Sequence, residues 1–333
     1  MMTGRTRLDT AHSWDSLALP ALAALTEQMS QQSFDVADTT DVPAVLGLSA
    51  YGVQRGDTFV RALLAEVLAQ ASTVAGNQAA QFAAAEAERL ITLRRADGMG
   101  WNYFPGIAEM PPDTDTLAAV TLALLLTGRR DAVDAHARRA LDCACQECAS
   151  PDGALPTWIV PAARRAADGR LRPPWDNCLW DGPAADVMPS LLYALHAYDS
   201  QRYESWLASG ASYLESTQGR RGRWAAPFYC DHLQASYVCL RFLGACRPAS
   251  SAIPRALDAI REAQQADGGW SGQAGSTAIA LLALAAVPGW LTADDHVKAQ
   301  AARCYLENTR RDDGTWPAHP YPVGCSKACR CGW

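Results

Sequence analysis

Two kinds of helical segment alternate along this chain, one amphipathic and one almost entirely apolar. The apolar segments are Asp115 to Leu126, Val187 to Leu195, Tyr237 to Leu243 and Thr277 to Val287. A helix that is apolar on every side has to be buried on every side, whereas an amphipathic helix buries only one stripe. The pattern therefore predicts an all-α protein, an (α/α)6-type toroid of about ten to twelve helices with apolar helices inside and amphipathic helices outside, in two concentric layers.

A short turn phrase recurs between these segments. Its clearest copies are Asp97-Gly98-Met99-Gly100-Trp101, Asp267-Gly268-Gly269-Trp270 and Asp313-Gly314-Thr315-Trp316, and weaker copies contain Asp152-Gly153 and Trp224. The last three Trp positions, 224, 270 and 316, are each 46 residues apart. A fixed period of this length is typical of repeated supersecondary units that bury a face against their neighbours. We expect the glycines to adopt positive φ and each Trp to pack over a helix end.

The repeat also suggests how the chain is divided. We expect an N-terminal helical arm over residues 1–34, the toroid over residues 35–324 and a Cys-rich tail over residues 325–333. Within the toroid, Asp38 to Asp41 and the residues after them resemble a first, weaker inner helix. Residues 160–183 read as a long loop at one mouth of the ring.

Composition narrows the function classes. The chain has 333 residues, is 49% hydrophobic and carries a formal charge of −6 without a basic cluster, which argues against nucleic acid as a partner. No run of about 20 apolar residues exists, so no transmembrane segment is expected. The first 30 residues do not resemble a secretory signal, so we expect a cytoplasmic protein whose eleven Cys are reduced thiols. Two Cys clusters, one of Cys143, Cys145 and Cys148 and one of Cys325, Cys329 and Cys331, lack paired zinc-finger spacing and are interpreted as incidental.

The candidate chemistry lies in the acidic motif Asp113-Thr114-Asp115-Thr116, at the start of an apolar helix. A carboxyl group that faces a dry cavity has a raised pKa, and an ionised neighbour raises that pKa further. Asp115, assisted by Asp113, could then protonate an alkene. The alternative is that both residues only cap the helix, because Asp and Thr are favoured N-caps.

Aromatic side chains near the predicted starts of the inner helices could stabilise a carbocation through their ring faces. Thr116 and His232 complete the expected substrate-binding set. The aromatic members of this set are Trp101, Tyr103, Phe104, Trp175, Trp180, Phe228 and Tyr229.

The turns resemble the repeats of squalene–hopene cyclases and of protein prenyltransferase β subunits. The acidic motif resembles the cyclase motif Asp-x-Asp-Asp-Thr, whose middle Asp is the proton donor. The resemblance covers roughly residues 35 to 325 and implies a class II terpenoid cyclase, with Asp115 as the acid and a small isoprenoid as the substrate. Thr116 stands where the family has a third Asp, and this chain has room for one helical domain where the long cyclases have two. The layout is similar to single-domain, squalene-cyclase-like bacterial proteins.

Two alternatives remain open. One is a zinc-dependent, prenyltransferase-like protein. A Cys, a His and a carboxylate can bind zinc, and the resemblance to the prenyltransferase β subunits implies Asp176, Cys178 and His232 for such a site. Otherwise His232 lines the cavity, bonds to the acid or caps its helix, and the protein needs no metal unless a diphosphate head group brings Mg2+. The other alternative is a non-catalytic toroid that binds an apolar ligand.

Overall fold

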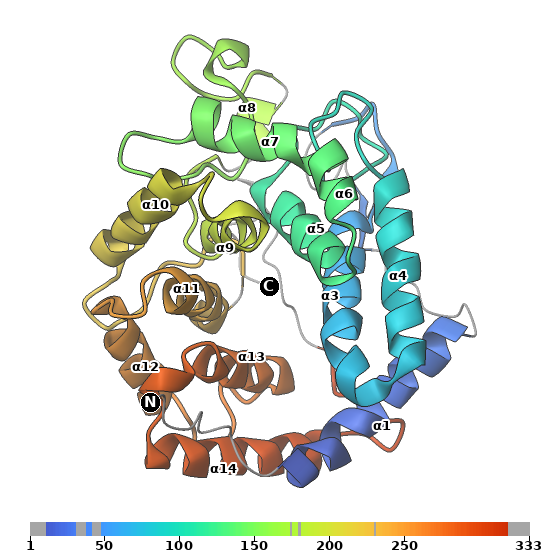
Figure 1. The fold of residues 1–333 in the computed structure, drawn as a ribbon, viewed down its shortest axis with the longest axis vertical. Helices are drawn as coiled ribbons and strands as arrows, with labels where there is room; N and C mark the ends of the chain where they lie inside the picture. The colour runs from blue at the N-terminus through green and yellow to red at the C-terminus, as the bar shows by residue number, and fades with distance from the viewer. Residues whose placement is uncertain are drawn as a thin grey trace.

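The helices of the protein form a closed ring of two layers (Figure 1). The computed structural model describes residues 11–30, 38–41, 48–173, 175–178, 181–229 and 231–318. The inner layer of this part of the chain consists of α3 (Thr58–Ala75), α5 (Thr114–Leu126), α9 (Met188–Asp199), α11 (His232–Cys246) and α13 (Ala274–Ala285). The outer layer consists of α4 (Asn77–Thr92), α6 (Arg130–Ala132), α7 (Arg138–Cys143), α10 (Glu204–Thr217), α12 (Ala252–Glu262) and α14 (Ala293–Thr309). The predicted all-α toroid is therefore confirmed.

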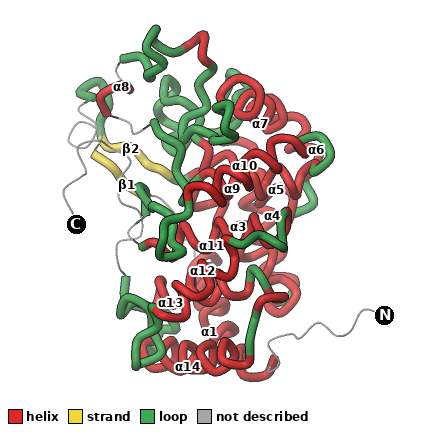
Figure 2. The backbone as a smooth tube through the Cα atoms, turned by 90° about the vertical axis from the view of Figure 1, so that its left-hand side faces the viewer, coloured by secondary structure: helices red, strands yellow, loops and turns green. Residues whose placement is uncertain are grey.

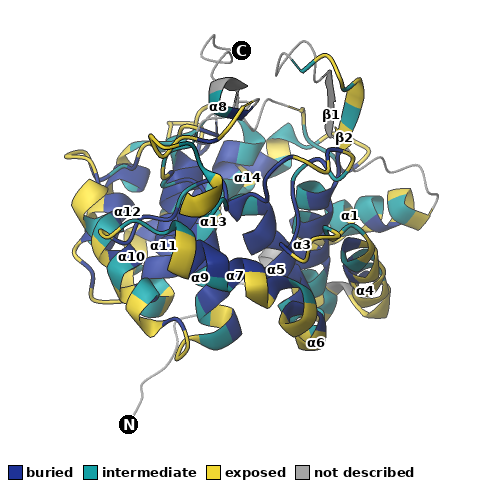
Figure 3. Cartoon of the chain, turned by 90° about the horizontal axis from the view of Figure 1, so that it is seen from above, coloured by how far each residue is buried: buried dark blue, intermediate teal, exposed yellow. Residues whose placement is uncertain are grey.

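The two layers follow the predicted division into apolar and amphipathic helices. In α5, every residue from Thr114 to Leu124 is buried except Asp115. In α12, by contrast, burial is confined to one side, which carries Ile253, Leu257 and Ile260. Figure 3 shows the same division, with buried residues concentrated on the inner helices and exposed residues on the outer ones. Helix α1 (Ala11–Ser30) completes the ring by packing against α14, α4 and α3.

The recurring turns attach each outer helix to the next unit, as the sequence predicts. The indole N–H groups of Trp101, Trp224, Trp270 and Trp316 donate to carbonyl oxygens of Leu90, Leu214, Ile260 and Leu306 near the ends of the preceding outer helices, at 2.7–2.9 Å. Gly268 has a φ of 89°, and a Cβ there would lie 2.5 Å from the carbonyl oxygen of Ala301. Both the positive φ and this close approach require glycine at the position.

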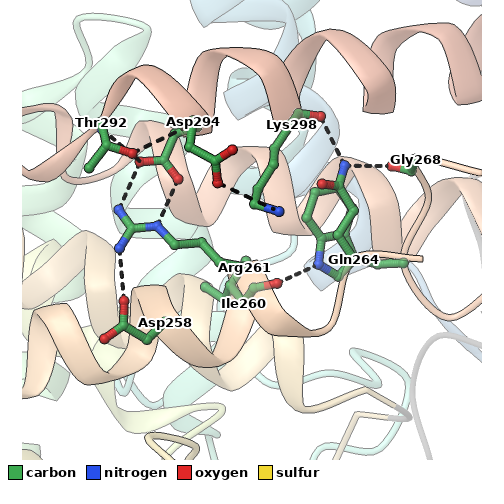
Figure 4. Close-up of polar contacts among 10 residues, drawn as sticks. Asp258, Ile260, Arg261, Gln264, Gly268, Thr292, Asp294 and Lys298 are labelled. Atoms are coloured by element: carbon green, nitrogen blue, oxygen red, sulfur yellow. Dashed lines mark hydrogen bonds and ion pairs between the residues drawn. The ribbon is translucent and has the colours of Figure 1, made fainter. Parts of the chain in front are cut away.

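Polar side chains join neighbouring outer helices (Figure 4). Arg261 on α12 forms an ion pair with Asp295 on α14 at 2.7 Å, and Asp295 also accepts the Thr292 backbone N–H in a capping box. Gln264 donates to the carbonyl oxygens of Gly268 and Lys298, both at 2.9 Å. The last described turn-and-helix units are therefore held together by partly buried hydrogen bonds and an ion pair as well as by apolar packing.

Two regions differ from a regular helical repeat. Asp38–Asp41 forms strand β1, which pairs antiparallel with β2 (Val53–Gly56), so the expected start of a weak inner helix at Asp38–Asp41 is wrong. Residues 42–47, where that helix was expected to continue, lie outside the described residues. Asp and Thr have low helix propensity, which explains why a segment built from them does not begin a helix. The first inner helix is instead α3. The described part of residues 160–183 is irregular as expected, apart from a short 3-10 helix (Ala162–Arg164) and α8 (Trp175–Cys178).

The irregular segments gather on one face of the ring. Figure 2 shows the β1–β2 sheet, α8 and several long loops on the same side, beyond the ends of the inner helices. The predicted Cys-rich tail (325–333) lies outside the described residues. No helix of the described chain is both long and apolar enough to cross a membrane.

Candidate active site

Three carboxyl groups belong to the site, two at the start of α5 and one just before α9. Asp113 is the N-cap of α5, and its Oδ1 accepts the backbone N–H of Thr116 at 2.7 Å. The capping role considered from the sequence is therefore real for Asp113. A β-bridge between Asp113 and Trp158 fixes the same residue from the other side, through the Thr114 N–H to Thr157 carbonyl bond at 2.8 Å. Asp113 is thus held rigidly beside the second residue of the helix, Asp115.

Asp115 is not a cap but is bonded to a distant side chain. The hydroxyl of Tyr229 donates a hydrogen bond to Oδ2 of Asp115. Tyr229 is itself held by the third carboxyl group, because Oδ2 of Asp186 accepts the backbone N–H groups of Phe228 at 2.8 Å and Tyr229 at 3.2 Å. Asp186 therefore fixes the segment that carries the partner of Asp115.

The three carboxyl groups all favour the neutral form more than free Asp does. Burial raises the pKa of Asp115 well above its ordinary value, and the negative charges of Asp113 and Asp186 raise it further, while the Tyr229 hydrogen bond lowers it. Burial also raises the pKa of Asp113 to about 6 and the pKa of Asp186 to about 6, against the opposing effect of their backbone hydrogen bonds. At neutral pH the arrangement therefore keeps a neutral Asp115 between two mostly ionised neighbours.

Accessibility distinguishes the three groups. Asp113 is 5% exposed and Asp186 is fully buried, whereas Asp115 keeps part of its surface accessible despite the dense protein around its carboxyl group. Of the three residues, Asp115 therefore offers the most surface to a bound molecule. The other two carboxyl groups can act on such a molecule through Asp115 and Tyr229.

Two clusters of aromatic side chains contact this end of α5. Phe104, Trp158 and Trp175 are buried together in one cluster, with the half-buried Tyr103 against it. The rings of Tyr103 and Phe104 lie 4.9 Å apart in an edge-to-face arrangement. Phe228 and Tyr229 form a second apolar cluster with Ala184 and Val187. Each cluster is joined to the acidic motif, the first by the bridge between Trp158 and Asp113 and the second by the bond from Tyr229 to Asp115.

Other residues of the predicted binding set are placed differently. Trp101 is fully buried and its indole holds the Leu90 carbonyl, so it belongs to the repeat core. Thr116 is also fully buried, and its backbone N–H serves the Asp113 cap. Trp180 lies outside the described residues.

His232 is the first residue of α11 and interacts with its neighbour in sequence. Its Nδ1 lies 3.1 Å from Oδ1 of Asp231, the residue that caps α11. Its Nε2 is buried and has no hydrogen-bond partner within the described chain, so His232 is not bonded to Asp115 there. The side chain of Cys178, which the zinc alternative needs beside Asp176, lies outside the described residues. Among the residues that the structure describes, no three His, Cys, Asp or Glu side chains gather as metal ligands.

Asp186 is the residue that the predicted site lacks. In the sequence it stands directly before Val187, Met188 and an apolar helix, and a carboxylate at such a place is also an ordinary candidate for a helix cap. Its partners are backbone N–H groups more than 40 residues away, which no local pattern reveals.

Solved structures of other proteins share this fold. A protein from Actinoplanes matches with a TM-score of 0.68 at 21% identity, over 91% of this chain and 82% of the other. The type II terpene cyclase MstE from Scytonema matches with a TM-score of 0.66 at 19% identity, over 93% and 84% of the two chains. An MstE variant in complex with its substrate, geranylgeranyl dihydroxybenzoate, gives a TM-score of 0.67 at 18% identity, over 93% and 83%. At these identities the likeness shows a common fold.

The family of the protein is identified from its sequence. No curated protein matches the chain. The sequence profile of the squalene-hopene cyclase C-terminal domain, however, matches residues 86–325, which is well over half of the chain and includes the acidic motif, Asp186 and Tyr229. The chain therefore belongs to the squalene-hopene cyclase C-terminal domain family.

Proposed function

We propose that this protein is a class II terpene cyclase in which Asp115 protonates a carbon–carbon double bond of an isoprenoid substrate. The observation that carries the proposal is the state of Asp115, a carboxyl group held neutral by burial and by two flanking carboxylates but still accessible to a ligand. A helix cap needs none of these features. A Brønsted acid for an alkene needs all of them, because its proton must be both retained at neutral pH and presented to the substrate.

The chemistry of the first step balances within the site. The O–H bond of Asp115 breaks as a C–H bond forms at the terminal double bond, which leaves a tertiary carbocation on the substrate and a carboxylate on Asp115. The Tyr229 hydroxyl stabilises that carboxylate through its hydrogen bond. The next double bond of the chain attacks the cation and closes a ring. Loss of a proton from the final cation gives a neutral product, and Asp115 regains its proton from solvent.

The surroundings suit a carbocation and an apolar chain. The ring faces of Tyr103, Phe228 and Tyr229 can stabilise positive charge without reacting as nucleophiles. The inner helices present apolar side chains such as Val67 on α3 and Leu282 on α13, which keep about half of their surface accessible, 51% and 49%. The family and the type II terpene cyclases with the same fold support an isoprenoid substrate, since MstE binds a geranylgeranylated one.

The test is proton transfer itself. Purified protein is incubated in D2O with farnesol, farnesyl diphosphate, geranylgeranyl diphosphate and a geranylgeranylated phenol, and cyclic products are analysed by mass spectrometry. We expect a cyclic product that carries one deuterium from the acid, and we expect Asp115→Asn to abolish it. Asp168→Asn, at an exposed loop position, is the matched control and should keep full activity. Equal product from the wild type and Asp115→Asn would exclude Asp115 as the acid.

A further inference from the structure

A second polar cluster lies on the inner helices, and the proposed chemistry does not use it. It consists of Glu66 on α3, Tyr193 on α9, and Tyr237 and Arg241 on α11, and we refer to it as the Arg241 cluster. Nη2 of Arg241 donates to Oε1 of Glu66 at 2.6 Å. The guanidinium carbon lies 4.2 Å from the ring centroid of Tyr193 and 6.0 Å from that of Tyr237.

The ion pair of this cluster crosses the inner ring. Helices α5 and α9 separate α3 from α11 on one side, and α13 lies between them on the other (Figure 1). The Arg241–Glu66 bond therefore joins two helices that are not neighbours in the layer. Helix α11 begins at His232, three residues after Tyr229, which is the partner of Asp115. Arg241 stands nine residues after His232, which corresponds to about 13 Å along the helix axis. The cluster therefore lies further along α11 than the end that carries the partner of Asp115.

The cluster keeps hydrogen-bonding capacity that the described chain does not use. A guanidinium group has five N–H donors. One donates to Glu66 and Arg241 also hydrogen-bonds to the Tyr237 side chain, which leaves further donors unused. Oε1 of Glu66 also accepts from Gln70 at 3.0 Å, but Oε2 accepts no hydrogen bond within the described chain. The Tyr193 hydroxyl likewise has no hydrogen-bond partner there, and the residue is only half-buried. Donors and an acceptor thus converge among apolar helices, which is typical of a site that orients a ligand.

The charge of the cluster limits which polar group it can accept. Glu66 balances Arg241, so the cluster is close to neutral overall. The described inner helices carry one further Lys or Arg residue, Arg61 on α3. It already forms ion pairs with Asp57 at 3.1 Å and with Glu86 at 2.9 Å. A diphosphate would bring several negative charges to a place that offers one compensated cation, whereas a hydroxyl or phenol can accept from Arg241 and donate to Glu66.

From this arrangement we propose that the Arg241 cluster binds the polar end of the isoprenoid substrate, and that this end is an uncharged hydroxyl or phenol rather than a diphosphate. The inference rests on the proposed function for the prenyl part of the ligand. It makes Arg241 and Glu66 the residues that select the head group, while Asp115 reacts with the far end of the chain.

Binding measurements test this without turnover, in an Asp115→Asn background. The affinities of farnesol, farnesyl diphosphate and farnesane, which has no head group, are compared by quenching of tryptophan fluorescence. The key variant is Arg241→Met with Glu66→Met, because removing both partners leaves no uncompensated buried charge. Arg255→Met, at an exposed position of α12, is the control.

We expect the double variant to bind farnesol at least tenfold more weakly, since it loses hydrogen bonds to charged groups, and to bind farnesane within about twofold of the parent. The parent should prefer farnesol to farnesyl diphosphate. Unchanged farnesol affinity in the double variant, a preference for the diphosphate, or no binding of farnesol by the parent would each overturn the proposal. Head-group-dependent binding without cyclic product in the wild type would instead count against the cyclase function alone.

Discussion

The hydroxyl of Tyr229 donates a hydrogen bond to Asp115 across 114 positions of sequence. This bond acts against burial and against the charges of Asp113 and Asp186, which all raise the pKa of Asp115. An acid catalyst benefits from both influences. Burial and the neighbouring charges keep the proton on Asp115 at neutral pH, and the Tyr229 hydrogen bond stabilises the carboxylate once the proton has moved to the substrate. The relationship between these two residues is therefore the centre of the proposed chemistry.

Replacing Tyr229 by Phe should slow proton transfer while leaving the ring in place. We expect kcat for cyclisation to fall about tenfold to a hundredfold, because the carboxylate formed on Asp115 loses its hydrogen-bond donor. The pKa of Asp115 should rise, so the decline of activity at high pH should move to higher pH. Tyr213→Phe, on the outer helix α10, is the control and should match the wild type. An unchanged kcat in Tyr229→Phe would show that the bond has no part in catalysis.

Replacing Asp186 by Asn should move the same pH profile in the opposite direction. Activity requires protonated Asp115, so it declines as pH rises through the pKa of that group. Removing the negative charge of Asp186 lowers this pKa, and the decline should therefore begin at lower pH. The Asn carbonyl oxygen can still accept the backbone N–H groups of Phe228 and Tyr229. A shift to higher pH, or none, would contradict the electrostatic role assigned to Asp186.

Asp113 should make the protein less stable as pH rises from about 4 to about 6. Its pKa in the folded state is about 6 and its ordinary value is 3.8, so the folded protein holds the proton over a range where the unfolded chain has released it. Stability from this group is present below pH 4 and is lost by the time the pH has passed 6. Asp113→Asn keeps a good N-cap and removes the buried charge.

We therefore expect Asp113→Asn to raise the free energy of unfolding by about 2 kcal/mol at pH 7.5 and by much less at pH 4, measured by denaturant titration. A variant that is less stable than the wild type at pH 7.5 would contradict the proposed cost of ionising Asp113.

Trp270 in the recurring turn and Trp290 at the end of the 3-10 helix Pro288–Trp290 should differ in importance according to burial. Trp270 is fully buried and donates to the Ile260 carbonyl at 2.8 Å, whereas Trp290 is 37% exposed and donates to the Pro248 carbonyl at 3.0 Å. Each Trp→Phe change removes one indole N–H bond, but only Trp270→Phe removes it from the fully buried core and leaves a cavity there. The Ile260 carbonyl keeps its bond from the Ala263 N–H at 3.2 Å. We expect Trp270→Phe to cost about 2–4 kcal/mol in unfolding free energy and Trp290→Phe less than about 1 kcal/mol. Equal losses would contradict the role of the buried turn in the repeat.

The fold was predictable because its signals are local and repeated. The apolar segment that became α13 and the Asp267–Trp270 turn each indicate a structure within a window of about a dozen residues. The segment Asp38–Asp41 is a strand where the sequence predicts the beginning of a helix, because its partner strand is more than ten residues away and its own pattern is too short to decide.

The site was predictable only in part, for a related reason. Asp113 and Asp115 stand together in one motif, but the contacts that define their chemistry come from Asp186 and Tyr229, which the ring brings to the start of α5. The sequence shows an aromatic residue at position 229 without showing that its hydroxyl points at the acid. The Arg241–Glu66 pair, 175 positions apart, was invisible for the same reason.

The most direct measurement is the protonation state of Asp115 at neutral pH, by infrared difference spectroscopy in H2O and D2O. At pH 7.5 we predict one carbonyl stretching band of a protonated carboxylic acid that is present in the wild type and in Asp186→Asn but absent from Asp115→Asn. A wild type without such a band, or a band that persists in Asp115→Asn, would contradict the account.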